Sequence, residues 1–186
     1  IGHSLGGALA LMLAIEAPDK IGDLVIVDSL PFFPAATNPA ATSEMMQPMA
    51  EGMRHSMQAQ TDEAYFQQAK AAASMGMSRD AARVAEIQQW GQDSARSATT
   101  QAMYELFTVD LRTELAKVKS RTLVLGAWAA YQPMGSTLES TRGIFESQYA
   151  TLQGVQIAMA PTAYHFIMFD EREWLLEQIG EFLTTP

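Results

Sequence analysis

The chain has 186 residues, of which 48% are hydrophobic, and this is enough apolar material for the core of one domain of ordinary size. Its formal net charge of −9 argues against a nucleic-acid partner. The absence of cysteine excludes a disulfide framework or a thiolate metal site, and no apolar run is long enough to span a membrane.

The chain opens with a Gly-x-Ser-x-Gly motif, in the string Ile1-Gly2-His3-Ser4-Leu5-Gly6-Gly7. The motif runs into an apolar stretch, 8–17, that predicts a buried helix ending at a proline. This pattern predicts a tight strand-to-helix turn that holds the Ser4 hydroxyl above the strand ends. We expect Gly2 and Gly6 to require glycine, because a side chain at either position would collide with the neighbouring helix or strand.

Short apolar runs predict three further buried, parallel strands, over 24–27, 122–125 and 155–159. Helices are expected between and after them, over 110–119, from a capping box at 136–139 to about 149, and from an acidic cap at 170–173 to the end. This alternation of strands and helices predicts a parallel sheet with right-handed crossovers.

The stretch 42–107 predicts helices only. Capping residues indicate where those helices begin, at Thr42 or Ser43, Thr61, Ser78, and Asp93 or Ser94. Glycines predict breaks near positions 76 and 91. We therefore divide the chain into a core part (1–30), a helical cap (31–109) and a second core part (110–186).

The string Gly-His-Ser-Leu-Gly-Gly with its apolar helix, together with the later segment 164–170 around His165, resembles the α/β-hydrolase superfamily, in particular capped serine esterases and lipases. The resemblance implies an α/β fold: part of an α/β-hydrolase domain, with a parallel sheet flanked by helices and an inserted all-helical cap. In that family about half of the fold precedes the serine turn. We therefore expect this chain to be the C-terminal part of a longer protein, and to be inactive alone.

The same resemblance implies the roles of three groups. Ser4 is the nucleophile, and His165 is the base that takes its proton. The Leu5 amide donates one hydrogen bond to the oxyanion, and the second donor comes from a segment that precedes this chain in the family.

The acid of the triad is less directly indicated. Its commonest family position lies after the strand at 122–125, but no carboxylate occurs from 126 to 132. The alternative position follows the preceding strand, where Asp28 lies, and we predict Asp28 as the acid. Glu139 and Asp110 are weaker candidates, and a Ser–His dyad without an acid is the remaining alternative.

Several ring-bearing side chains lie near the predicted strand ends, where they could either line a substrate pocket or fill the core: His3, Phe32, Trp128 and Tyr131. The three histidines are far apart in sequence, and neither a metal-binding nor a phosphate-binding motif is present. We therefore expect no metal and no cofactor.

These residues predict a serine hydrolase that cleaves a small-molecule carboxylic ester or similar acyl bond through an acyl-enzyme. One alternative is a cofactor-free perhydrolase or a C–C bond hydrolase on the same fold. Another is a non-catalytic binding protein on a decayed hydrolase scaffold. Nothing in the sequence specifies an oligomeric state or a cellular compartment.

Overall fold

A computed structural model describes residues 1–185, and in them one parallel sheet has four strands in the order β1-β2-β3-β4. The strands are β1 (Gly2–His3), β2 (Leu24–Val27), β3 (Thr122–Gly126) and β4 (Gln156–Met159). In the register of the sheet, Val27 pairs with Leu125 and Leu125 pairs with Ala158. The predicted parallel sheet is confirmed.

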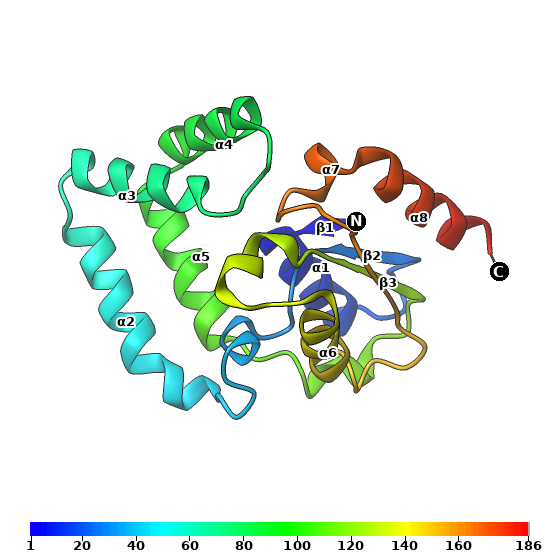
Figure 1. Ribbon diagram of the computed structural model, residues 1–186. Coiled ribbons are helices and arrows are strands. Elements are labelled where there is room, and N and C mark those ends of the chain that lie inside the picture. Colours follow the sequence, from blue (N-terminus) through cyan, green and yellow to red (C-terminus); the bar gives the residue numbers. More distant parts are fainter. Residues whose placement is uncertain (186) are drawn as a thin grey trace.

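Helices surround the sheet and form the cap (Figure 1). The α-helices are α1 (Leu5–Glu16), α2 (Ser43–Ala59), α3 (Asp62–Ser74), α4 (Ala81–Asp93), α5 (Arg96–Thr108), α6 (Leu138–Gln148), α7 (Ile167–Asp170) and α8 (Arg172–Thr184). Short 3-10 helices are η1 (Phe33–Ala36), η2 (Glu114–Lys117) and η3 (Ala129–Met134). No helix within residues 1–185 combines the length and the apolar character that crossing a bilayer requires.

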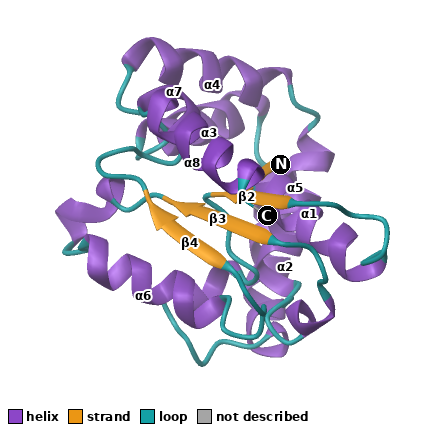
Figure 2. Cartoon of the chain, turned by 90° about the vertical axis from the view of Figure 1, so that its right-hand side faces the viewer, coloured by secondary structure: helices purple, strands orange, loops and turns teal. Residues whose placement is uncertain are grey.

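The sheet is buried on both faces (Figure 2). Leu24 and Ile26 of β2 pack with α1 and α6, whereas the alternate residues Val25 and Val27 pack on the other face with α8. Side chains on a strand point to opposite faces in turn. A strand covered on both faces therefore has the continuous apolar sequence that predicted β2 and β3.

The four cap helices lie between β2 and β3 in sequence and stand beside the sheet (Figure 1). In the cap, α2 packs along α5 and α3 along α4. Ala50 of α2 and Thr100 of α5 are both fully buried, so small side chains allow these two helices to approach closely. Thr42 and Thr61 cap α2 and α3 as predicted, by accepting hydrogen bonds from the amides of Met45 and Ala64.

Three of the predicted helix boundaries within the cap are wrong. Asp80, not Ser78, caps α4, and α5 begins at Arg96 after a residue that makes no side-chain cap. Gly91 lies inside α4, whereas Gly76, with a φ of +104°, does follow the end of α3.

Boundaries in the second core part also differ from the prediction. The segment 110–119 contains only the short 3-10 helix η2. Thr137 and Ser140 form the capping box of α6, in place of the predicted box at 136–139. The final helix begins at Arg172 without a side-chain cap, because the carboxylates of Asp170 and Glu171 accept hydrogen bonds elsewhere.

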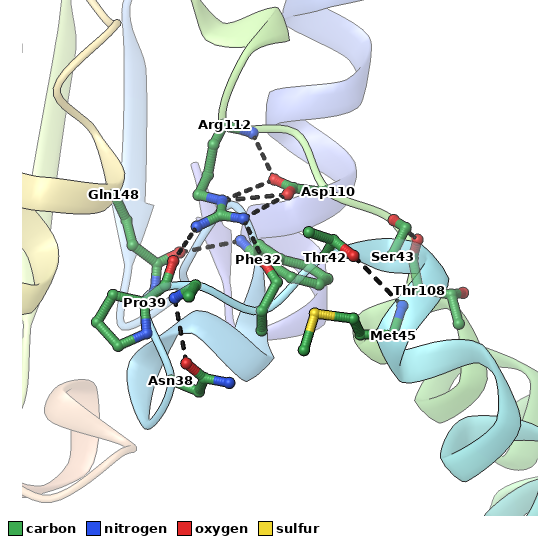
Figure 3. A network of polar contacts seen from close by, with 12 residues as sticks. Phe32, Asn38, Pro39, Thr42, Ser43, Met45, Thr108, Asp110, Arg112 and Gln148 are labelled. Carbon is green, nitrogen blue, oxygen red and sulfur yellow. Dashed lines mark hydrogen bonds and ion pairs between the residues drawn. The ribbon is translucent and has the colours of Figure 1, made fainter.

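One arginine joins the segments that enter and leave the cap (Figure 3). The Arg112 guanidinium pairs with Asp110 at 2.6 Å and donates to the carbonyl oxygens of Pro39 (3.1 Å) and Ala41 (2.8 Å). It also lies over the Phe32 ring, 5.0 Å from the ring centroid. The two ends of the cap insertion are thus held together at one point on the core.

The turn between β1 and α1 depends on two glycines. A Cβ on Gly2 would lie 2.2 Å from the Gly6 carbonyl oxygen, and a Cβ on Gly7 would lie 2.5 Å from the Ser29 Cβ. A Cβ on Gly6, by contrast, would have no neighbour within 4 Å among the described residues. The expectation for Gly2 is therefore correct and that for Gly6 is wrong, because the glycine that faces the sheet is Gly7.

We predict that Gly2→Ala and Gly6→Ala will have opposite effects on stability. The Gly2 substitution forces backbone atoms apart, and we expect it to lower the free energy of unfolding by about 3 kcal/mol or more. The Gly6 substitution adds a helix-favouring residue in open space, and we expect a change between zero and a gain of about 1 kcal/mol. Urea unfolding of both variants measures this, and equal losses would contradict it.

Candidate active site

Ser4 lies at the carboxyl end of β1 in a strained conformation, with φ 52° and ψ −123°. Its amide donates to the Val27 carbonyl oxygen (3.0 Å), which extends the strand pairing by one residue, and its own carbonyl oxygen accepts from the amides of Gly7 and Ala8 at the start of α1. The sharp bend therefore lies at the serine itself, as the motif predicted. A non-glycine residue held at such a positive φ costs of the order of 1–3 kcal/mol, and such residues cluster at functional sites.

The Leu5 amide is the first of the helix. The amides of the first helical turn have no partner within the helix, and the Leu5 amide has no hydrogen-bond acceptor among residues 1–185. This N–H and the positive end of the helix dipole are therefore available to an oxyanion beside Ser4.

Asp28 and His165, far apart in the chain, are in direct contact. Asp28 Oδ2 lies 2.6 Å from His165 Nδ1, and the two side chains are 12% and 21% exposed. The other carboxylate oxygen accepts the Ala127 amide at 2.8 Å. Asp28 has a φ of 43°, which turns the chain sharply at the end of β2. Both oxygens of this nearly buried carboxylate are therefore hydrogen-bonded.

This contact fixes the orientation of the imidazole and the tautomer of its neutral form. A carboxylate only accepts hydrogen bonds, so in the neutral ring Nδ1 of His165 carries the proton and Nε2 carries the lone pair. No hydrogen bond joins the Ser4 hydroxyl to this imidazole within residues 1–185. Hydrogen bonds of this type are often long without substrate and tighten in the reacting complex.

The weaker acid candidates lie elsewhere. Asp110 is paired with Arg112 at the base of the cap, and Glu139 is exposed in the first turn of α6. Neither forms a hydrogen bond to His165. The loop after β3, where the commonest family position falls, supplies instead the Ala127 amide that holds Asp28.

His3 connects the serine turn to the histidine loop, which we define as residues 160–166. His3 Nε2 lies 3.0 Å from the His165 carbonyl oxygen, and because a carbonyl only accepts, Nε2–H of His3 is the donor. The His3 ring lies 4.6 Å from the rings of both His165 and Phe166. Burial, followed by the repulsion from His165, lowers the pKa of His3 to about 4.

The other residues predicted near the pocket take different positions. Phe32 is fully buried in a small cluster with Ala35 and Ala41, so its ring is not open to a substrate. Trp128 packs against the core cluster and donates its indole N–H to the Pro161 carbonyl oxygen (3.1 Å). Tyr131 is half exposed in η3, and burial of its hydroxyl group together with the Asp28 charge raises the pKa of its phenol.

A small apolar pocket of about 20 Å³ lies beside Leu5, between α1, the loop after β2 and α5. Its lining contains none of the side chains of Ser4, Asp28 and His165. A void of this size has room for about one water molecule, so it does not define a substrate site. Among residues 1–185, no cluster of three or more His, Asp or Glu side chains could hold a metal ion.

Comparisons with known proteins identify the family and the fold of this chain. The family model described as the alpha/beta hydrolase family matches residues 1–178. A hydrolase from Pseudomonas aeruginosa superimposes with a TM-score of 0.75 at 16% identity, over 99% of this chain and 63% of that one. No curated protein sequence matches the chain.

Two further solved structures are similar. An esterase from Exiguobacterium antarcticum has a TM-score of 0.73 at 16% identity and covers 99% of this chain and 65% of its own. The enol-lactonase from Burkholderia xenovorans has a TM-score of 0.72 at 16% identity, with 99% and 64% covered. This chain spans less than two thirds of the length of these proteins. At such identities the likeness shows the fold.

We predict that His3 makes stability depend on pH between its folded and unfolded pKa values, about 4 and 6.5. In this range the unfolded chain binds a proton at His3 and the folded chain does not. The contribution of neutral His3 to the free energy of unfolding is therefore complete above pH 6.5 and is lost as the pH falls towards 4. From pH 7 to pH 5 this loss is about 2 kcal/mol, at about 1.4 kcal/mol per pH unit.

The measurement is urea unfolding of the wild type and His3→Gln at both pH values. Glutamine keeps an N–H donor but does not titrate, so its stability should fall less than that of the wild type. All other titrating groups are shared by the two proteins. Equal falls would show that His3 titrates normally in the folded state.

Proposed function

The chain belongs to the alpha/beta hydrolase family, and from this premise we propose that it is a serine hydrolase that cleaves a carboxylic ester or similar acyl bond. Ser4 is the nucleophile, His165 the general base and Asp28 the acid. The observation that carries the proposal is the 2.6 Å contact between Asp28 and His165 at the sheet edge where the strained Ser4 lies.

In the proposed reaction, Nε2 of His165 takes the Ser4 proton while the hydroxyl oxygen attacks the substrate carbonyl carbon. The Leu5 amide donates to the oxyanion that forms. The imidazolium is stabilised by Asp28 and gives its proton to the leaving group, which departs and leaves an acyl-enzyme. Water, deprotonated by His165, then releases the acid and restores Ser4.

The Asp28 contact favours an enzyme over a binding protein, because the reason for considering the latter was the missing acid after β3. An ester or lactone substrate is in keeping with two of the similar structures, which are described as an esterase and an enol-lactonase.

Ser4→Ala and His165→Ala should each reduce the cleavage of short p-nitrophenyl esters by the intact protein. We expect a fall of at least about 1,000-fold in kcat for either variant, and a double variant no worse than the singles, because the two groups act as one unit. Unchanged thermal melting would show that the loss is chemical. Wild-type rates in both variants would exclude the mechanism.

Asp28→Asn tests the acid separately. The asparagine amide can either accept from or donate to Nδ1, and it has no charge, so it no longer selects the tautomer of His165 that carries the proton on Nδ1. We therefore expect kcat to fall about 10⁴-fold. The control is Asp19→Asn, since Asp19 is 80% exposed in a surface ion pair with Lys119. A small effect of Asp28→Asn, equal to that of the control, would instead favour a Ser–His dyad.

A further inference from the structure

The histidine loop is bonded to the cap through its backbone. The His165 amide donates to the Gly76 carbonyl oxygen at 3.2 Å, and the Phe166 amide donates to that of Met77 at 2.8 Å. Gly76 has a φ of +104°, and a Cβ there would lie 2.8 Å from the Ala130 Cβ. We call the segment 75–80, between α3 and α4, the cap tether. It runs beside the loop that carries the proposed base.

A carboxylate strengthens this junction. Asp170, at the end of α7, accepts hydrogen bonds from the Ser78 hydroxyl (2.6 Å) and the Arg79 amide (3.0 Å), both in the cap tether. Its other oxygen accepts the Tyr164 amide at 2.8 Å, immediately before His165. Hydrogen bonds to an ionised acceptor are about twice as strong as neutral ones. One side chain therefore connects the cap to the residue that precedes the imidazole.

Helix α4 adds apolar and cationic contacts to the histidine loop and to α7, which follows it. The Trp90 ring lies 6.1 Å from that of Phe166 and 6.2 Å from that of Phe169, and these two phenylalanines stack on each other at 5.4 Å. The Arg83 guanidinium lies 4.7 Å from the Phe169 ring centroid. The cap thus meets the region around His165 through a surface that includes a helix as well as the tether.

We propose that Asp170 is a positioning residue for His165, and that the cap holds the imidazole in place through residues 75–80. This inference rests on the proposed function. Asp170 contacts no reacting group and acts through the histidine loop. On the opposite side His3 binds the His165 carbonyl oxygen, so both backbone polar groups of His165 are held. A misplacement of about 1 Å at a reacting group costs about 100-fold in rate.

The test is Asp170→Asn in the intact protein. The amide nitrogen replaces one acceptor by a donor, which then faces a backbone N–H, that of Arg79 or that of Tyr164, and breaks one side of the junction. We expect kcat for a p-nitrophenyl ester to fall about 10- to 100-fold, with a change in KM of less than about threefold. The downfield proton resonance of His165 Nδ1–H, which reports its bond to Asp28, should shift or broaden.

The matched control is Asp23→Asn. Asp23 accepts hydrogen bonds from the Arg121 guanidinium at 2.9 Å and 2.7 Å, and it lies just before β2, at the end of the sheet opposite to the histidine loop. This variant should keep the wild-type kcat and resonance. A wild-type kcat together with an unmoved resonance in Asp170→Asn would overturn the inference, since a purely structural residue lowers the melting temperature without moving either.

Two outcomes need a second measurement. If Asp170→Asn does not fold, Ser78→Ala removes the hydroxyl that donates to Asp170 and accepts from the Asp80 amide, and leaves the Asp170 carboxylate intact. We expect a loss of about 3- to 10-fold in kcat with the same shift of the resonance. No change in either would overturn the inference.

Failure of the proposed function would show in the wild type, as absence of ester cleavage and of Ser4 labelling by a fluorophosphonate probe. The His165 resonance alone then decides the inference.

Discussion

The candidate site depends on the meeting of parallel strand ends at one edge of the sheet. Hydrogen bonds of the sheet continue just beyond the strands, from the Ser4 amide to Val27 and from the Asp28 amide to Leu125. Because all the strands run in the same direction, the residues that follow them lie side by side. Ser4 and Asp28 are thereby placed before any side-chain contact forms, and the contact of Asp28 with His165 adds the third segment, which follows β4.

Backbone strain is concentrated at the same two residues. Within residues 1–185, Ser4 and Asp28 are the non-glycine residues with positive φ, at 52° and 43°. Each such conformation costs of the order of 1–3 kcal/mol and persists only where surrounding contacts compensate for it. Here the compensation comes from the sheet hydrogen bonds, from the helix that starts directly after Ser4 and from the hydrogen bond that the Ala127 amide donates to Asp28. The hydrogen bonds of the sheet therefore offset the free-energy cost of these two strained conformations.

The sheet and the serine turn were predictable from the sequence because their signals are local. A β-branched apolar run specifies a buried strand, and the Gly-x-Ser-x-Gly motif around Ser4 specifies a bend. The features that were mispredicted depend on contacts that are distant in sequence. Ser78 resembles a helix cap, but its hydroxyl is bound to Asp170, which is 92 residues away. The need for glycine at position 7 arises from Ser29, in the loop after β2.

The acid could be narrowed down but not decided by spacing, because two neighbouring strand ends can reach one imidazole. What distinguishes Asp28 from the other candidates is its contact with His165, which spacing does not reveal. The motif itself predicted only that His3 lies directly before the nucleophilic serine. Its hydrogen bond to the His165 carbonyl oxygen needed the fold, because nothing in the local sequence specifies which segment lies over the serine turn.

The pairing of residues 75–80 with the histidine loop also has a consequence for how such proteins can diversify. Caps are natural units to exchange when a new pocket shape is wanted. The four cap helices alone would not be an exchangeable unit in this protein. Residues 75–80 and the segment around His165 hydrogen-bond to each other, through the carbonyl oxygens of Gly76 and Met77 and the carboxylate of Asp170. A chimera that takes its cap from one parent and its last strand and histidine loop from another would pair two segments that do not have matching hydrogen-bond partners. The practical cut points lie outside both segments, so that the two are inherited together.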